Sequence, residues 1–230
     1  FFFTLPRFFT QNFPSAEDDL KKLALFQWNK FLFTSLNGSR EAKSFFDEMM
    51  ERISWLPLQE FHFRPEHSRD YIIDANWALY CENYLEGFHI PFVHEGLNAI
   101  IDYGNYTTEL YPYSSLQLGL AKDEDIVFDL PATSKDAGKK IAGYYFWIFP
   151  NMMFNFYPWG LSINIVRPLE VDKTKVSFLA YVWDENKLRQ GAGANLHQVE
   201  MEDEDVVQNV QKGIRSRFNK HGRYSVKRVT

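Results

Sequence analysis

Short β-rich runs of apolar residues, separated by turn signals, recur along the chain, and each run predicts a β-strand. The expected strand regions are Phe26–Leu36, Phe61–Ile73 on either side of Pro65-Glu66, 105–120, Tyr144–Phe149, Leu161–Val166 and Val176–Trp183. The runs beyond residue 100 follow one another without long helical patterns between them. This order favours an antiparallel sheet.

Apolar residues at helical spacing predict three helices. They span Ser39, as N-cap, to about Ile53, Asn76 to about Phe88, and about Leu196 to Arg217. Pro91 must end or kink the second helix, because proline has no backbone N–H to donate. The polar stretch Ala121–Lys140 is expected to be a mobile surface loop, with a possible role as a lid. Helices combined with antiparallel strands indicate the α+β class, with the long C-terminal helix packed across the sheet.

The composition fits a soluble globular protein of 230 residues, with 45% hydrophobic and 24% charged residues. The aromatic share of 17% is high, and such rings suit the walls of an apolar cavity as well as a core. The net charge is −5, and the sequence lacks the clustered lysines and arginines of a nucleic-acid-binding protein. We therefore expect a small-molecule ligand and no nucleic-acid partner.

Cys81 is the single cysteine of the sequence, so the chain can form neither an intrachain disulfide nor an iron–sulfur cluster of its own. The cytoplasm is therefore the default compartment. No run of apolar residues is long enough to span a membrane. The chain opens on Phe1-Phe2-Phe3 without a methionine, and we expect further sequence to precede it in the full protein.

His89 and His94 lie five residues apart. On an unbroken helix this spacing separates them by roughly 140°, which is poor for binding one metal ion. A break at Pro91 would place His89 at the helix end and let His94 swing back. Glu86, three residues before His89, and Glu82 lie on the same helical face, and either could accept a ring N–H. Two solvated acids on a helix surface are the alternative.

The C-terminal helix carries an acidic run in which helical periodicity singles out one residue. Its acids are Glu200, Glu202, Asp203, Glu204 and Asp205, and its apolar stripe is Leu196, Val199, Val206, Val210 and Ile214. Asp203 falls in the middle of this stripe, so it points towards the core while the other four can be solvated. A buried carboxylate needs a metal ion, a cation such as an arginine, or a strong set of hydrogen bonds. Two histidines and one carboxylate are the facial triad of non-haem Fe(II) oxygenases.

Three separated segments carry a resemblance to a known family. The first is Asn76-Trp77, Glu82-Asn83-Tyr84-Leu85-Glu86-Gly87-Phe88-His89 and His94. The second is Phe149-Pro150-Asn151 with Tyr157 and Arg167-Pro168, and the third is Glu202-Asp203 with Val210-Gln211-Lys212-Gly213. In this order they resemble the catalytic domain of the α subunits of Rieske-type non-haem iron oxygenases. The motif Glu-Asn-Tyr-Leu-Glu is similar to the motif found in the branch of choline and carnitine monooxygenases.

The resemblance implies a helix-grip domain with Fe(II) on His89, His94 and Asp203. It implies activation of O2 to hydroxylate or demethylate a small aromatic or quaternary-amine substrate. It also implies a homotrimer in which a Rieske [2Fe-2S] cluster, fed by a reductase or ferredoxin, passes electrons to the iron of the next subunit. Glu86 matches the acid that bridges the two centres.

The cluster itself requires two cysteines and two histidines that these residues do not supply. By the resemblance, residues 1–36 are the tail of a Rieske domain with its lead-in, and residues 37–230 are the catalytic domain. The cluster is then expected in the full-length protein and not on this chain.

Two other functions remain compatible with the residues. A metal-free helix-grip module would use the aromatic rings to hold a hydrophobic ligand, and a zinc hydrolase would use the same three ligands with a water. The absence of a His-Glu-x-x-His motif counts against the hydrolase. The candidate substrate-pocket residues, which are aromatic in every case, are Tyr145, Trp147, Phe154, Tyr157 and Trp159.

Overall fold

The computed structural model describes residues 19–37, 41–122, 126–220 and 222. The expected N-cap Ser39 lies outside the described residues. The chain forms two compact units, Phe1–Ala42 and Lys43–Thr230.

The first unit contains an antiparallel hairpin of β1 (Leu25–Trp28) and β2 (Phe31–Thr34). The single strand expected over Phe26–Leu36 is therefore wrong. Asn29 has a φ of 52°, and asparagine tolerates this left-handed conformation, so the chain reverses at the Asn29-Lys30 loop. The 3-10 helix Ala42–Phe45 follows, across the boundary between the units.

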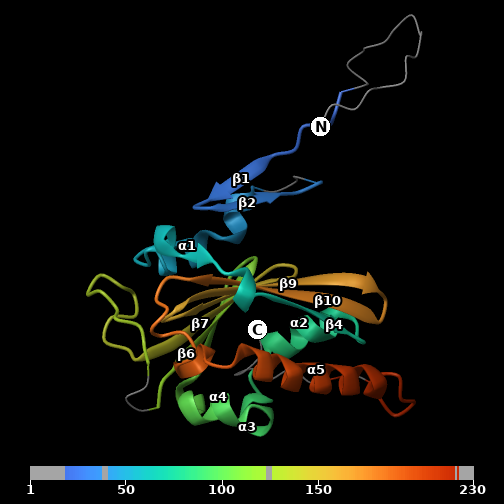
Figure 1. Ribbon diagram of the computed structural model, residues 1–230. Helices are drawn as coiled ribbons and strands as arrows, with labels where there is room; N and C mark the ends of the chain where they lie inside the picture. The colour runs from blue at the N-terminus through green and yellow to red at the C-terminus, as the bar shows by residue number, and fades with distance from the viewer. Residues whose placement is uncertain (1–18, 38–40, 123–125, 221, 223–230) are drawn as a thin grey trace, which may run out of the picture. The chain divides into compact units, whose positions relative to one another are not determined.

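An eight-stranded antiparallel sheet forms the body of the second unit (Figure 1). Its strands are β3 (His62–Phe63), β4 (Arg69–Ile73), β5 (Thr107–Leu110), β6 (Ser114–Leu120), β7 (Ile141–Ile148), β8 (Met152–Tyr157), β9 (Gly160–Glu170) and β10 (Lys173–Val182). The order across the sheet is β3-β10-β9-β8-β7-β6-β5, and β4 also pairs with β10. From β5 to β10, sequential strands are neighbours. Short turns join all of these pairs except β6 and β7, which the segment 121–140 connects.

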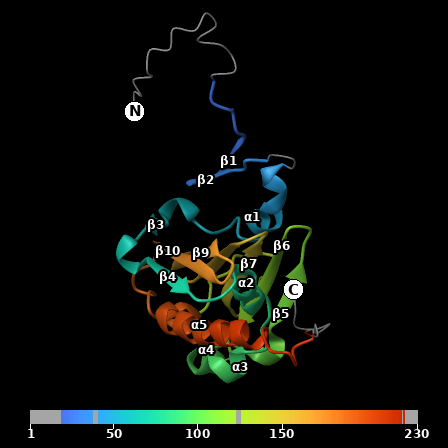
Figure 2. The same cartoon turned by 90° about the vertical axis from the view of Figure 1, so that its right-hand side faces the viewer.

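Helices lie on one face of this sheet. They are α2 (Trp77–Leu85), α3 (Ile90–Val93), α4 (Glu95–Ile100) and α5 (Leu196–Gly213). Figures 1 and 2 both place α5 along this face, and α2 packs against α5 and β9. The α+β class, with an antiparallel sheet packed by a C-terminal helix, is confirmed.

The opposite face of the sheet is covered by the segment around α1 (Asp47–Arg52). Met49 and Ile53 are fully buried, and the Phe46 ring meets the Phe154 ring edge to face at 6.2 Å. Because both faces are covered, the central strands are buried along almost their whole length. This burial explains the nearly continuous apolar sequences of β7 and β8.

The described part of 121–140 is more firmly packed than a free surface loop. Phe128 and Asp136 are buried, and Asp136 binds Arg52 of α1 at 2.5 Å. None of its described residues lines the cavity described below. These contacts argue against the expected lid. In the described part of the chain, every helix is too short or too polar to cross a membrane.

Candidate metal centre

The two histidines lie in a break between short helices. Asn76 caps α2, with its side chain accepting from the N–H of Ala78, and α2 ends at Leu85. The expectation that this helix reaches Phe88 and is stopped by Pro91 is therefore wrong. Pro91 instead lies in the first turn of α3, where a missing N–H costs nothing.

This break orients both rings. His89 immediately precedes α3, and His94 joins α3 to α4. Their rings lie nearly perpendicular with centroids 4.9 Å apart. The break between the helices therefore brings the two rings together, whereas an unbroken helix would hold them roughly 140° apart around its axis.

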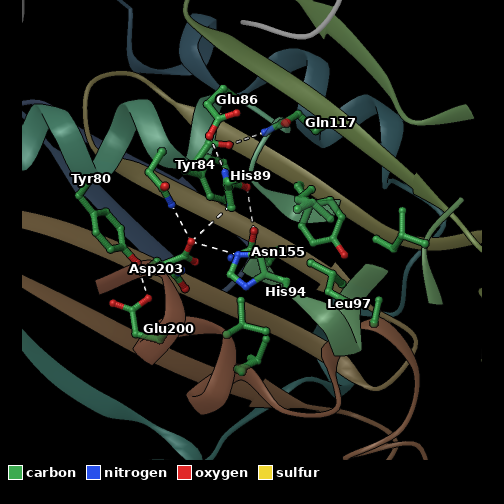
Figure 3. A pocket seen from close by; sticks show the side chains of 18 of the residues that line it. Tyr80, Tyr84, Glu86, His89, His94, Leu97, Gln117, Asn155, Glu200 and Asp203 are labelled. Carbon is green, nitrogen blue, oxygen red and sulfur yellow. Dashed lines mark hydrogen bonds and ion pairs between the residues drawn. The ribbon is translucent and has the colours of Figure 1, made fainter. Parts of the chain in front are cut away.

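Asp203 of α5 completes the group (Figure 3). Its Oδ1 lies 3.3 Å from His89 Nε2 and 3.1 Å from His94 Nε2. One donor atom from each of the three residues lies within 4.8 Å of the other two. The structure thus brings together the three residues that the sequence singled out as ligands.

Each histidine is held through its other ring nitrogen by a carboxylate. His89 Nδ1 lies 2.5 Å from Glu86 Oε1, and His94 Nδ1 lies 2.7 Å from Glu202 Oε2. Because an ionised carboxylate can only accept, both Nδ1 atoms carry the proton. Neutral rings then turn the lone pairs of both Nε2 atoms towards Asp203, which is the arrangement of metal-bound histidines.

When both rings are neutral, the three inward-facing atoms are all acceptors, and a shared cation has to hold them together. Burial lowers the pKa of His89, but hydrogen bonds to Asp203 and Glu86 outweigh burial and raise it to about 9. Burial raises the pKa of Asp203, but hydrogen bonds from the two histidines bring it down to about 2. Protons can therefore fill this role, and so can a divalent metal ion.

The distances also fit a metal ion. Two ligands about 2.1 Å from one ion, at right angles to each other, lie about 3 Å apart. The oxygen-to-nitrogen distances of 3.1 and 3.3 Å are close to this value. A set of two imidazoles and one carboxylate with open positions suits non-haem Fe(II).

Helix α5 presents a different face to the core from the one that its valines predicted. Val210 and Ile214 are 43% and 42% exposed, whereas Glu200 is only 1% exposed. The expectation that Glu200 is solvated is therefore wrong. The reason is α2, because Tyr80 donates to Glu200 at 2.6 Å and Asn83 donates to Asp203 at 2.7 Å.

Sequence reasoning also missed Glu202, which it placed on the side of the helix and treated as solvated. Signals for both acids were present in the sequence. Glu202 adjoins Asp203, and Glu200 lies one helical turn before it, where i,i+3 residues share a face. Glu82, by contrast, is exposed, as in the surface alternative.

A cavity of about 100 Å³ opens beside the three residues. Among the predicted pocket residues, Tyr145 and Tyr157 line it. Phe154 pairs with Phe146 across β7 and β8, and its ring faces the opposite side of the sheet, towards Phe46. The remaining two, Trp147 and Trp159, pack in the adjoining apolar clusters and not on the cavity wall.

A polar network fixes the end of α2, where the histidine segment begins. The Tyr84 hydroxyl donates to Asn155 at 2.8 Å, and Gln117 donates to the Tyr84 carbonyl at 2.7 Å. Tyr106 donates to Gln117 at 3.2 Å. Asn155 pairs with Tyr145 and Gln117 also pairs with Tyr145, so register gathers these polar groups on one sheet face.

Known proteins are similar to this chain in sequence. The chloroplastic choline monooxygenase of Arabidopsis thaliana is 29% identical over an alignment of 235 positions, and the match covers 94% of this chain and 53% of the relative. The carnitine monooxygenase oxygenase subunit of Acinetobacter pittii is 26% identical over 148 residues, which cover 62% of this chain and 39% of the relative. The chain thus spans about half the length of the choline monooxygenase that it matches.

Solved structures share the fold. A quaternary ammonium Rieske monooxygenase superposes with a TM-score of 0.68 at 19% identity, covering 85% of this chain and 53% of that chain. Naphthalene 1,2-dioxygenase superposes with a TM-score of 0.58 at 14% identity, covering 84% and 53%.

The family model for the catalytic domain of ring-hydroxylating α subunits matches residues 58–228. This segment includes the complete sheet from β3 onwards, the three converging residues and the carboxylates that hold the histidines. The chain therefore belongs to the family of ring-hydroxylating oxygenase α subunits, as part of their catalytic domain.

Proposed function

We propose that this chain holds one Fe(II) ion on His89, His94 and Asp203 and serves as the catalytic domain of a Rieske-type oxygenase. The observation that carries the proposal is the convergence of two Nε2 atoms and a carboxylate oxygen, with both Nδ1 atoms bonded to acids. A bound iron would supply the activation of O2 and the oxidation of a small organic substrate. The relatives support this activity over a metal-free binding module.

The chain's own residues would prepare the site for that chemistry. Glu86 and Glu202 keep the Nδ1 protons in place, so that both Nε2 atoms remain free to bind the metal. Asn83 holds Oδ1 of Asp203 from the side. The buried rings of Tyr145 and Tyr157 exclude water from the cavity next to the ligands.

Electrons would arrive from a Rieske [2Fe-2S] cluster in the full-length protein, reduced by a ferredoxin or reductase. Cys81 is the chain's single cysteine and is buried, so the cluster ligands would lie outside these 230 residues. In this proposal residues 1–36 form the tail of the Rieske domain and residues 37–230 the catalytic domain. The full protein would be a homotrimer.

Glu86 is the proposed bridge between the cluster of one subunit and the iron of the next. It binds His89 on one side, yet its side chain remains 24% exposed. Phe92 of α3 is 89% exposed, so the histidine segment offers apolar surface to a neighbouring subunit. A residue that links the cluster of one subunit to the iron of the next must contact an iron ligand and must also reach the subunit surface.

The substrate would be a small aromatic compound or a quaternary amine, oxidised by O2. Related proteins are named as choline and carnitine monooxygenases, and a structural neighbour is a naphthalene dioxygenase. We also propose a cytoplasmic location, although the plant relatives are named chloroplastic. Imaging the tagged full-length protein tests the compartment.

Iron content tests the proposed metal site. Purified chain, reconstituted anaerobically with Fe(II), should hold one iron per chain, and Asp203→Asn should lose most of it. Asp205→Asn, on the same helix and exposed, is the matched control and should keep its iron. Equal iron in both variants, or none in the unmodified chain, would refute the site.

A further inference from the structure

Glu200 is a buried acid on the cavity wall that the proposed metal site does not use. It lies one turn before Asp203 on α5 and is 1% exposed. Its Oε2 accepts a hydrogen bond from the Tyr80 hydroxyl at 2.6 Å. Its Oε1 is buried and has no hydrogen-bond partner in the described part of the chain.

No lysine or arginine is among the described residues that line the cavity, so the protein offers no counter-ion there for Glu200. Burial raises the pKa of Glu200 well above its usual range, the hydrogen bond from Tyr80 lowers it, and the charge of Asp203 raises it again. An ionised Glu200 is therefore costly until a positive charge arrives beside it.

The remaining walls suit a positive charge. Aromatic rings attract cations through the negative potential over their faces, and they do so most strongly when the cation is desolvated. The rings that line the cavity are those of Tyr80, Tyr84, Tyr106, Tyr145, Tyr157 and Phe178. The cavity of about 100 Å³ is far below the roughly 300 Å³ of the smallest typical drug-sized pockets, so its ligand is small.

We propose that Glu200, together with these rings, forms the subsite for the positively charged nitrogen of a small alkylated ammonium substrate. The inference rests on the proposed function, because it takes this cavity as the substrate cavity. A quaternary nitrogen has no N–H, so its methyl groups contact the carboxylate and the rings, and the attraction is electrostatic. Tyr80 positions the carboxylate, since it holds the second oxygen. Glu200 thereby selects a cationic substrate over a neutral aromatic one.

The test compares two probes of the same shape and different charge: choline and its neutral carbon analogue 3,3-dimethylbutan-1-ol. Their dissociation constants are measured by calorimetry under anaerobic conditions, with the iron content of each sample. The unmodified chain should prefer choline by about tenfold or more, which corresponds to about 1.4 kcal/mol. Glu200→Gln should reduce this preference to less than about threefold while binding the neutral probe unchanged.

Two further variants act as controls. Glu204→Gln makes the same change on the same helix, at a residue that does not line the cavity, and should keep the preference. Glu200→Asp keeps the charge and should keep most of the preference if Glu200→Gln fails to fold. Unchanged binding of the neutral probe shows that a variant's cavity is intact.

Equal affinity of the unmodified chain for both probes would overturn the inference. So would a full preference for choline in Glu200→Gln. Failure of the proposed function has a different signature: a chain without bound iron that still prefers choline through Glu200 would refute the oxygenase site and leave the cation subsite standing.

Discussion

Replacing Glu202 with glutamine should weaken metal binding without removing any ligand. The Glu202 carboxylate accepts the Nδ1 proton of His94 at 2.7 Å, and Gln198 holds its other oxygen at 2.9 Å. His94 itself is 2% exposed, so water cannot readily replace this partner. Glutamine has the same shape and still offers an oxygen to the ring, so the substitution removes the charge and keeps the hydrogen bond.

The size of the effect follows from that difference. Loss of a partner that orients a metal-bound histidine costs about 10- to 100-fold in metal affinity. A charge-assisted hydrogen bond is roughly twice as strong as a neutral one, so Glu202→Gln should lie near the tenfold end, about 1.4 kcal/mol. The Glu202 side chain is 27% exposed, which screens its charge and also favours the lower figure. Glu202→Ala removes both contributions and should approach 100-fold.

Competition between the protein and a chelator of known affinity measures these constants, with Fe(II) under anaerobic conditions. Glu204→Gln is the matched control, because it removes one carboxylate two residues further along α5. If Glu202→Gln and Glu204→Gln bind iron with affinities within twofold of each other, the role of Glu202 in orienting His94 is refuted.

Three further predictions concern the same unit. In the full-length enzyme, Glu86→Gln should keep one iron per subunit but cut turnover at least about tenfold. Full iron with normal turnover would contradict the bridging role, and loss of iron would make Glu86 part of the metal site. Because the pKa of folded His89 is about 9, above the unfolded value of about 6.5, its contribution to stability is complete below pH 6.5 and is lost as pH rises through 9. Urea unfolding of metal-free protein should therefore show a free energy of unfolding that falls as pH rises from 6.5 to 9. Metal affinity should rise over the same range as His89 loses its proton. A free energy of unfolding and a metal affinity that do not change with pH would exclude this titration. Asp136→Ala leaves the buried Arg52 guanidinium with Glu109 as its remaining carboxylate partner, so unfolding should cost about 1–3 kcal/mol less, with unchanged iron content. A loss below about 1 kcal/mol would mean that the pair contributes little.

The strands were the most predictable part of the fold, because burial of the central strands favours apolar residues within them. The runs Tyr144–Phe149, Leu161–Val166 and Val176–Trp183 correspond to β7, β9 and β10, with shifted ends. Apolar content alone could not reveal the reversal in Phe26–Leu36. That reversal depends on the conformation of one residue, Asn29, inside an otherwise strand-like run.

Asp203, one of the three proposed ligands, could be found in the sequence because a carboxylate on an apolar helix face is costly without a partner. The acids around them could not be assigned in the same way. Hydrophobic periodicity predicts the buried face of α5 from the residues of α5 alone. Val210 and Ile214 therefore determined the predicted face, and the acids did not. The buried face is set instead by the partner helix, because Tyr80 and Asn83 of α2 offer donors to Glu200 and Asp203. Pairing between two helices is a tertiary property that a single helix does not encode.

The charges gathered around the cavity bear on which substrate class it suits. Glu86, Glu200 and Asp203 line it, and Glu202 lies behind His94, so four carboxylates surround the site, with no lysine or arginine among the described lining residues. With all four ionised and both histidines neutral, a divalent metal leaves a formal charge of −4 + 2 = −2. A neutral aromatic hydrocarbon would leave that charge uncompensated in a desolvated cavity, where Coulomb energies are large. Beside a neutral ligand only a proton on Glu200 would reduce this charge, whereas a monovalent ammonium would cancel half of it with Glu200 still ionised. The aromatic walls alone suit both substrate classes, and the surplus of carboxylates favours the cationic one.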